Sequence, residues 1–246
     1  MASKVSPQGP DYGNWVSWKL LLAAGLASVV LFALSLLFIY LVIGAVLALA
    51  EFVLFAYGRY QQSPRGGNVQ AKLWDSLVER LDWDGHGRAI DIGCGNGPVA
   101  IRVAKRYPGA EVVGVDVWGT MWEYSKAKCD ENAKAEKVGN RVLFQMADAA
   151  KLPFEDGAFD AAVSNDVFHN VRGVKDKRAV LKEALRVVKK GGSFSFQDGF
   201  TVKRYYHWEA DELVGAIRSW GVANVSFEKL PYARVVGGVS AIWGVK

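Results

Sequence analysis

The longest apolar stretch of the chain lies near its N-terminus, where residues 20–50 contain no charged side chain. A membrane-spanning helix needs about 20 residues, whereas one helix of this length would be roughly 46 Å long against ~30 Å of hydrocarbon. We therefore expect residues 15–57 to form a membrane segment. Two helices, 16–36 and 39–57, joined by a tight turn fit this length better than one strongly tilted helix.

The flanks of this segment predict its surroundings. Residues 1–14 are polar and rich in proline and glycine, which predicts a mobile tail, and residues 58–68 read as a linker. The apolar stretch is too long for the hydrophobic region of a cleaved signal peptide. Basic residues favour the cytoplasmic side, so we expect a cell-membrane protein whose large domain faces the cytoplasm. These residues are Lys19, Arg59, Arg65 and Lys72.

Beyond the linker, residues 69–246 alternate between helical and strand patterns, and this alternation predicts one domain. The order indicates an α/β fold: a Rossmann-like, doubly wound, mostly parallel seven-stranded sheet. The expected helices are 69–81, from 98 onward, 121–137, 175–189 and 208–219. The expected strands are 89–92, 111–115, 141–146, 159–164, 193–197, 224–230 and 235–245.

Composition narrows the class of partner. The net charge is +5, with basic and acidic residues interspersed, which suits a solvated surface with some affinity for anionic membrane and not a nucleic-acid interface. Two cysteines, Cys94 and Cys129, indicate neither a disulfide framework nor a zinc site, and we expect no bound metal.

A glycine-rich turn follows the first expected strand, in the sequence Asp91-Ile-Gly93-Cys-Gly95-Asn-Gly97-Pro98. Strand, glycine turn and helix together place main-chain N–H groups against a ligand. A dinucleotide-binding fingerprint would require glycine at position 98, where proline stands. The pattern instead resembles motif I of the class I S-adenosylmethionine (SAM)-dependent methyltransferases. The resemblance implies that Gly93, Cys94, Gly95, Asn96 and Gly97 pack against the methionine part of SAM, with Asp91 close to its amino group.

Acidic residues also follow the next two strands, at the edge of the sheet where ligands of such folds bind. Asp116 suits the two ribose hydroxyls, and Asp148 suits the adenine amino group. Either residue alone would fit a helix cap or a turn equally well. Four neighbouring residues complete the expected cofactor site: Val117, Trp118, Ala149 and Asn165. For Trp118, a place in the core is an equally good interpretation.

Two further stretches make the resemblance closer. LPFEDGAFD (152–160) and LRVVKKGG (185–192) are similar to stretches of the UbiE-like and type 11 methyltransferases, with Lys190 where proline is usual. DVWGTMWEYSK (116–126) resembles a membrane-attached bacterial subgroup that carries an N-terminal hydrophobic hairpin. The resemblance gives no acceptor.

The loop after the fourth strand should lie over the transferred methyl group. His169 is the candidate general base, because its ordinary pKa of about 6.5 is near neutrality, and Asp166 is a weaker candidate. A capping or packing role for His169 stays open. Residues past the fifth strand are candidates for the acceptor site: Asp198, Tyr205, Tyr206 and His207.

The sequence thus predicts a membrane-anchored enzyme that transfers a methyl group from SAM to a small, hydrophobic or membrane-held acceptor, leaving S-adenosylhomocysteine. Two alternatives remain: a methyltransferase of a soluble, thiol-like nucleophile, and a non-catalytic scaffold that binds SAM. Removing residues 1–60 should leave SAM binding intact but lower the activity on an acceptor in the bilayer.

Overall fold

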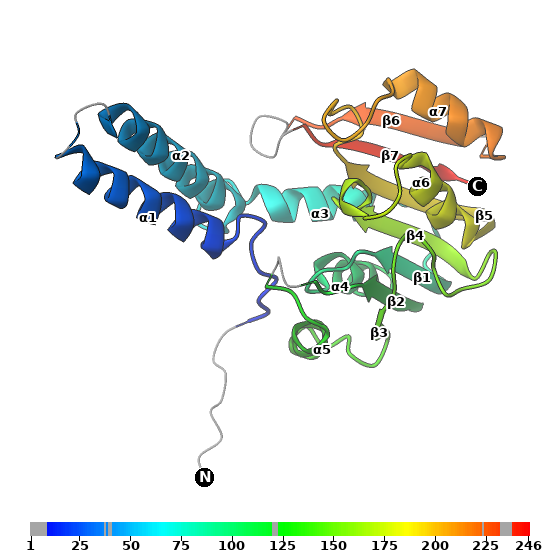
Figure 1. Ribbon diagram of the computed structural model, residues 1–246. Coiled ribbons are helices and arrows are strands. Elements are labelled where there is room, and N and C mark those ends of the chain that lie inside the picture. The colour runs from blue at the N-terminus through cyan, green and yellow to red at the C-terminus, as the bar shows by residue number, and fades with distance from the viewer. Residues whose placement is uncertain (1–8, 37, 39–40, 120–122, 223, 232–237) are drawn as a thin grey trace, which may run out of the picture. The chain divides into compact units, whose positions relative to one another are not determined.

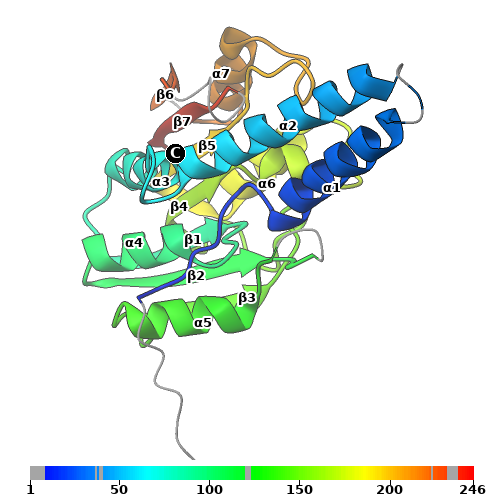
Figure 2. The same ribbon diagram turned by 90° about the vertical axis from the view of Figure 1, so that its left-hand side faces the viewer.

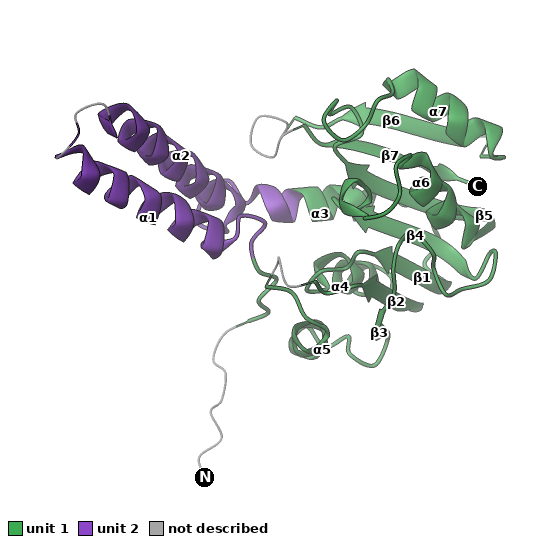
Figure 3. Ribbon diagram, in the orientation of Figure 1, with its two compact units in different colours: residues 1–13, 73–246 green, residues 14–72 purple. Residues whose placement is uncertain are grey.

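The computed structural model describes residues 9–36, 38, 41–119, 123–222, 224–231 and 238–246. The chain divides into two compact units, one formed by residues 1–13 and 73–246 and the other by residues 14–72 (Figure 3). The boundary falls inside helix α3 (Val69–Glu79).

The smaller unit is built around α1 (Trp18–Ser35) and α2 (Leu41–Gln62), which pack side by side (Figure 1). Both helices are long and apolar enough to cross a membrane. A Cβ atom on Gly25 would lie only 3.2 Å from the Phe52 ring, so this glycine permits the close approach. At one end of the pair, the Arg59 guanidinium lies 3.9 Å from the centre of the Trp18 ring and donates to the carbonyl of Val16.

The expected bounds of these helices need one correction. The second helix runs to Gln62 and not to residue 57, so residues 58–62 of the expected linker are helical. The uncharged, polar sequence Tyr60-Gln61-Gln62 continues a helix without strain, and Pro64 follows shortly after its end. Residues 37, 39 and 40 of the expected turn lie outside the described residues.

The larger unit contains the expected seven-stranded sheet, in the order β3-β2-β1-β4-β5-β7-β6. Strands β1 to β5 pair parallel with one another, and β7 pairs antiparallel with both β5 and β6 (Figure 1). The strands are β1 (Gly87–Ile92), β2 (Ala110–Asp116), β3 (Val142–Met146), β4 (Phe159–Asn165), β5 (Val188–Asp198), β6 (Asn224–Lys229) and β7 (Ser240–Val245). The helices are α4 (Pro98–Arg106), α5 (Lys126–Ala135), α6 (Arg178–Arg186) and α7 (Ala210–Ser219), with the 3-10 turn η1 (Phe168–Asn170).

Helices cover both faces of this sheet. Ile90 and Phe194 face one side, where they join a buried cluster with Leu181 of α6 and Leu213 of α7. On the other side, the side chain of Gln197 bonds to Ser76 of α3 over 2.9 Å, and Asp91 bonds to α4. The alternation of side chains along each buried strand therefore separates the helices into two layers.

Several expected helices are shorter than predicted. Helix α5 begins at Lys126, where the Ser125 hydroxyl caps the main-chain N–H of Lys128 over 3.2 Å; residues 120–122 lie outside the described residues. Helix α6 covers Arg178–Arg186 and not 175–189, because Val188 already pairs with Phe159 in the sheet. Helix α7 begins at Ala210 and not at 208, after a capping box formed by Glu209 and Glu212.

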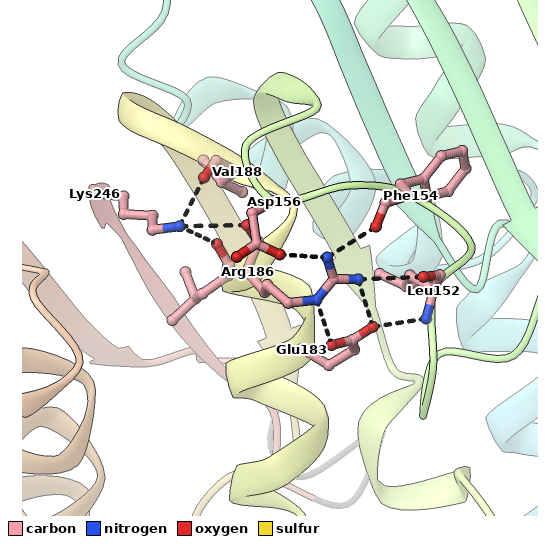
Figure 4. A network of polar contacts seen from close by, with 8 residues as sticks. Leu152, Phe154, Asp156, Glu183, Arg186, Val188 and Lys246 are labelled. Carbon is pink, nitrogen blue, oxygen red and sulfur yellow. Dashed lines mark hydrogen bonds and ion pairs between the residues drawn. The ribbon is translucent and has the colours of Figure 1, made fainter.

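The two stretches that most resemble UbiE-like proteins meet around one guanidinium group (Figure 4). Arg186 bonds with Glu183 and Asp156 and donates to the carbonyl oxygens of Phe154 and Leu152 over 2.8 and 3.2 Å. Nearby, the Lys246 ammonium donates to the carbonyls of Leu185 and Val188, each over 2.8 Å. These stretches therefore fix the loop before β4 onto α6, which is a structural role.

Candidate active site

The glycine turn after β1 is bonded to the end of β2. The N–H groups of Gly93 and Cys94 donate to the carbonyl of Val115 over 2.7 and 3.0 Å. Gly93 has a φ of +75°, and a Cβ atom there would collide with Val167 of the loop after β4. The position therefore requires glycine, and it brings the first and fourth strand ends together.

Asp91 is the buried carboxylate of this turn, with 1% exposure. Its Oδ2 accepts the main-chain N–H of Ala100 in the first turn of α4 over 2.9 Å. Gly97, which precedes this helix, has no side chain to cap it, so Asp91 satisfies one of the free N–H groups from a distance. Burial raises the pKa of Asp91 to about 7. The hydrogen bond from Ala100 lowers this pKa, and the nearby charge of Asp116 raises it further.

Asp116 at the end of β2 binds the same turn. Its Oδ2 accepts the N–H of Gly95 over 2.9 Å, and its Oδ1 accepts the N–H of Trp118 over 2.8 Å. The indole of Trp118 donates in turn to the carbonyl of Gly95 over 2.8 Å. Each carboxylate oxygen can accept a second hydrogen bond, so Asp116 keeps acceptor capacity for a ligand. Trp118 is half-buried with a φ of +41°, and Val117 is 55% exposed.

The remaining expected cofactor residues lie at neighbouring strand ends. Asp148 is exposed after β3, and its Oδ1 accepts the N–H of Ala150 over 2.8 Å. Ala149 beside it is buried. Asn165 is half-buried at the last position of β4, where it pairs with Gln197 of β5. Asn96 is 3% exposed, and its side-chain oxygen accepts the N–H of Ser125 over 3.1 Å.

Tyr124 belongs to this site although the sequence did not single it out. A Cβ atom on Gly95 would lie 3.4 and 3.5 Å from the Cδ2 and Cε2 atoms of Tyr124, so the ring rests against the glycine turn. Burial raises the pKa of Tyr124, and the charges of Asp166 and Asp116 raise it further. Its ring therefore lies near the carboxylates at the ends of two strands, β2 and β4. An aromatic residue in the loop after β2 was the only available signal.

His169, in the turn η1 after β4, and Asp198, at the end of β5, form a close pair. Nδ1 of His169 lies 2.8 Å from Oδ1 of Asp198, and the main-chain N–H of His169 donates to Oδ2 over 3.3 Å. The side chain of Asp198 is fully buried and that of His169 is 10% exposed. Burial lowers the pKa of His169, but the hydrogen bond and charge of Asp198 outweigh it, so the net pKa is raised. Oδ1 of Asp166 lies 3.8 Å from the same Nδ1, and this side chain is 43% exposed.

The three aromatic or basic candidates past β5 point to different places. Tyr205 is 40% exposed and lies against the imidazole of His169, with 4.4 Å between ring centres. Tyr206 is 1% exposed and packs on Phe200 and Trp208, so it is a core residue. Burial and the charge of Asp198 raise the pKa of Tyr206. His207 is exposed, outside the group formed by His169, Asp198 and Tyr205.

Comparison with known proteins identifies this arrangement. The family model described as "Methyltransferase domain" matches residues 90–196, which run from β1 to β5. Residues 90–196 of the larger unit therefore form a class I SAM-dependent methyltransferase domain. The matched range contains the glycine turn, Asp116, Asp148 and His169, and it ends two residues before Asp198.

Relatives of the methyltransferase domain act on different small molecules. The 27-O-demethylrifamycin SV methyltransferase of Amycolatopsis mediterranei (strain S699) is 32% identical over 159 residues, which cover 64% of this chain and 56% of that protein. The ubiquinone/menaquinone biosynthesis C-methyltransferase UbiE of Geobacter sp. (strain M21) is 33% identical over 116 residues, which cover 47% of this chain and 46% of that protein. The chain thus spans about half the length of these relatives.

A solved structure shows the same fold. Geranyl diphosphate methyltransferase in complex with SAM aligns with a TM-score of 0.56 and 16% identity, over 73% of this chain and 86% of that one. Asp116 acts electrostatically on Asp91, and Asp116 and Asp166 both act on Tyr124, so negative charge gathers beside the glycine turn, which suits a cationic cofactor such as SAM.

The same cluster also contains metal-type donors. Asp166, His169 and Asp198 offer three ligand atoms within 4.8 Å of one another, the one such group among the described residues. Nδ1 of His169 is already engaged with Asp198, which is the geometry of a hydrogen-bonded pair that holds a proton. Methyl transfer from a sulfonium needs no metal, so we interpret the group as a proton-transfer site.

Proposed function

We propose that this protein is a membrane-anchored, SAM-dependent methyltransferase of a small acceptor that is hydrophobic or held in the bilayer. The observation that carries the catalytic part is the His169–Asp198 pair, which joins the turn η1 after β4 to the end of β5, and β4 lies beside β1 and its glycine turn. A domain that only bound SAM would have no need for a buried carboxylate bonded to an imidazole beside that turn. Such a pair suits an acceptor that must lose a proton.

The cofactor residues have distinct roles in this proposal. SAM supplies a methyl group on a sulfonium that is already activated for displacement. Asp116 accepts from the ribose hydroxyls, Asp148 accepts from the adenine amino group, and Asp91 compensates the charge of the amino group. The rigid turn between Gly93 and Gly97 holds the main chain close to the methionine part. Together these contacts position the methyl donor, and positioning supplies much of the rate of a displacement.

His169 is the proposed general base. Asp198 accepts from Nδ1–H, which fixes the tautomer and leaves Nε2 as the basic nitrogen. Tyr205 lies against the imidazole and limits its rotation, and its exposed edge is available to an acceptor. Asp198, in contrast, is fully buried and acts through His169. Asp166 adds a second negative charge that favours the imidazolium once the proton has been transferred.

The anchor is proposed from the surface of the smaller unit. Apolar side chains of both helices are exposed on several sides, and Leu22, Leu26, Phe32 and Ile43 are each at least 66% exposed. Exposed apolar surface of this extent is costly in water and suits hydrocarbon. The basic residues beside the helices favour a cytoplasmic position for the methyltransferase domain.

The acceptor is proposed from chemistry. An apolar anchor has a clear use if the acceptor is itself a lipid, such as a quinone precursor, and the UbiE relative supports this class. The rifamycin relative supports a hydroxyl as the methylated group. We therefore propose a phenol, an enol or a carbon acid attached to an apolar body.

Calorimetric titration of the full-length protein with SAM tests the cofactor assignment. Asp116→Ala should weaken SAM binding by about tenfold or more, because two ribose hydroxyls lose their acceptor and the Gly95 N–H loses its partner. Asp84→Ala is a matched control in the exposed loop before β1 and should leave the affinity unchanged. Equal affinities for wild-type protein and Asp116→Ala would exclude the ribose assignment.

A further inference from the structure

Residues 9–13, which we name the N-terminal strap, are bound to the methyltransferase domain and are not free along their length (Figure 2). The N–H of Asp11 donates to Oδ1 of Asn132 over 2.9 Å, and Nδ2 of Asn132 donates to the carbonyl of Asp11 over 2.8 Å. Asn132 lies on α5 and is 2% exposed. The expectation of a mobile tail over residues 1–14 is therefore wrong for this part; residues 1–8 lie outside the described residues.

The same amide group also binds the glycine turn. Nδ2 of Asn132 donates a second hydrogen bond, over 3.0 Å, to the carbonyl of Asn96. One buried side chain thus connects the strap to the turn expected to hold the methionine part of SAM. A buried amide that lost one of these partners would be left unsatisfied, which is costly.

Tyr124 forms a second connection between the strap and the turn. A Cβ atom on Gly13 would lie 3.1 Å from Cε1 of Tyr124 and 3.3 Å from Nδ2 of Asn96. The opposite edge of the same ring, at Cδ2 and Cε2, faces Gly95. The ring is therefore held between a glycine of the strap and a glycine of the turn. Gly13 has a φ of +74°, which a larger residue would adopt only with strain.

Tyr12 fixes the strap at its centre. Its hydroxyl donates to Oε1 of Glu136 over 3.1 Å, and its ring meets Trp74 edge-on with 5.7 Å between ring centres. The Arg102 guanidinium lies 5.5 Å from the centre of the Tyr12 ring. These contacts use both the polar and the apolar parts of the side chain, so the strap is a packed element.

From these contacts we infer that the N-terminal strap and Tyr124 are part of the SAM-binding site: the strap holds Tyr124 over the glycine turn, where the ring contacts the methionine part of the cofactor. This inference rests on the proposed function. An aromatic face beside a sulfonium is favourable, because the ring quadrupole attracts a cation. The strap is thus a positioning element for Tyr124.

The inference changes what removal of the hairpin should do. Deletion of residues 1–60 removes the strap together with both apolar helices, so SAM affinity should fall and not stay intact as expected for a simple anchor. Deletion therefore cannot separate anchoring from cofactor binding, and point variants are needed.

The test compares two glycine variants of the full-length protein by calorimetric titration with SAM. Gly13→Val pushes the strap away from Tyr124 and should weaken SAM binding about tenfold. Gly215→Val on α7 is the matched control, because a Cβ atom at Gly215 would meet nothing within 4 Å, and its affinity should equal that of wild-type protein. Tyr124→Phe should bind SAM like wild type, whereas Tyr124→Ala should bind weakly. Wild-type affinity in Gly13→Val would overturn the inference.

Hydrogen exchange of the unmodified protein provides a second readout. Because linkage is reciprocal, SAM should slow exchange of the Asp11 amide, which donates to Asn132. Unchanged exchange of the Asp11 amide in the presence of bound SAM would overturn the inferred role of the strap and leave the proposed function standing. A wild-type protein that bound no SAM would overturn the proposed function as well.

Discussion

Nδ1 of His169 lies 2.8 Å from Oδ1 of Asp198, and the main-chain N–H of His169 donates to the other oxygen of the same carboxylate. Two hydrogen bonds from one residue to one buried carboxylate fix both the position and the tautomer of the imidazole. With Nδ1–H held by Asp198, the proposed mechanism assigns proton transfer from the acceptor to Nε2.

Replacing the imidazole tests its role as a base. His169→Gln should lower kcat by about 10²–10⁴-fold, because no other group at this position takes up the acceptor proton, while the dissociation constant of SAM should stay unchanged. His86→Gln is the control, since this histidine is 80% exposed in the loop before β1. Single-turnover methyl transfer and calorimetry measure the two quantities. Full activity in His169→Gln would show that His169 is a packing residue and not the base.

The pH dependence follows from the direction of the His169 shift. The protonated imidazole is favoured in the folded protein, so its pKa lies above the ordinary value of about 6.5. A base acts when neutral, so kcat/KM should rise with pH through this raised pKa and then level off. The stability that the Asp198 interaction adds is present below pH ~6.5 and is lost as pH rises through the folded pKa. In Asp198→Asn the rise of kcat/KM with pH should move to lower pH. If the rise stays at the same pH, it reports another group and not His169.

We expect Asp91 to release a proton when SAM binds. Its folded pKa of about 7 lies above the ordinary value of ~3.9, so the folded protein holds a proton that a nearby cation would displace. SAM affinity should therefore increase from about pH 5.5 to 7, by at most tenfold per pH unit. Calorimetry in two buffers of different ionisation enthalpy measures the released proton. Asp91→Asn should show no release, and a release of the same size in that variant would contradict the assignment.

Arg186 is expected to stabilise the folded protein and to have no part in catalysis. Arg186→Ala should lower the free energy of unfolding by about 2–4 kcal/mol, because Glu183 and the carbonyls of Leu152 and Phe154 lose charge-assisted partners. Arg178→Ala is the control: this arginine bonds with Asp176, two residues away, and lies over the Trp208 ring at 5.5 Å, so the free energy of unfolding should barely change. Urea denaturation of the full-length protein followed by fluorescence gives both values.

Much of the fold was readable from periodicity and strand ends. The succession of strands and helices along the chain and the positions of Asp91, Asp116 and Asp148 at or after strand ends were predicted, whereas the order of the strands within the sheet was not. The Ser125 cap gave a local signal for the start of α5 that the hydrophobic pattern alone missed.

Long-range contacts were not predictable in the same way. Asp11 and Asn132 are 121 residues apart, and no periodicity connects them. Tyr124 follows Asp116 by eight residues, but its contact with Gly95 depends on how the intervening loop folds. Tyr205 and Tyr206 are adjacent in sequence, yet one lies against His169 and the other is in the core, because the chain turns between β5 and α7.

The most direct test of the account uses methyl-labelled SAM added to membranes that contain the full-length protein, followed by separation into organic, aqueous, volatile and protein fractions. We expect label in the organic fraction, and no label there when the membranes contain His169→Gln. Label in the aqueous or volatile fraction would contradict a bilayer-held acceptor and indicate a soluble nucleophile. No transfer in any fraction, with SAM bound to the protein, would contradict the proposed catalysis itself.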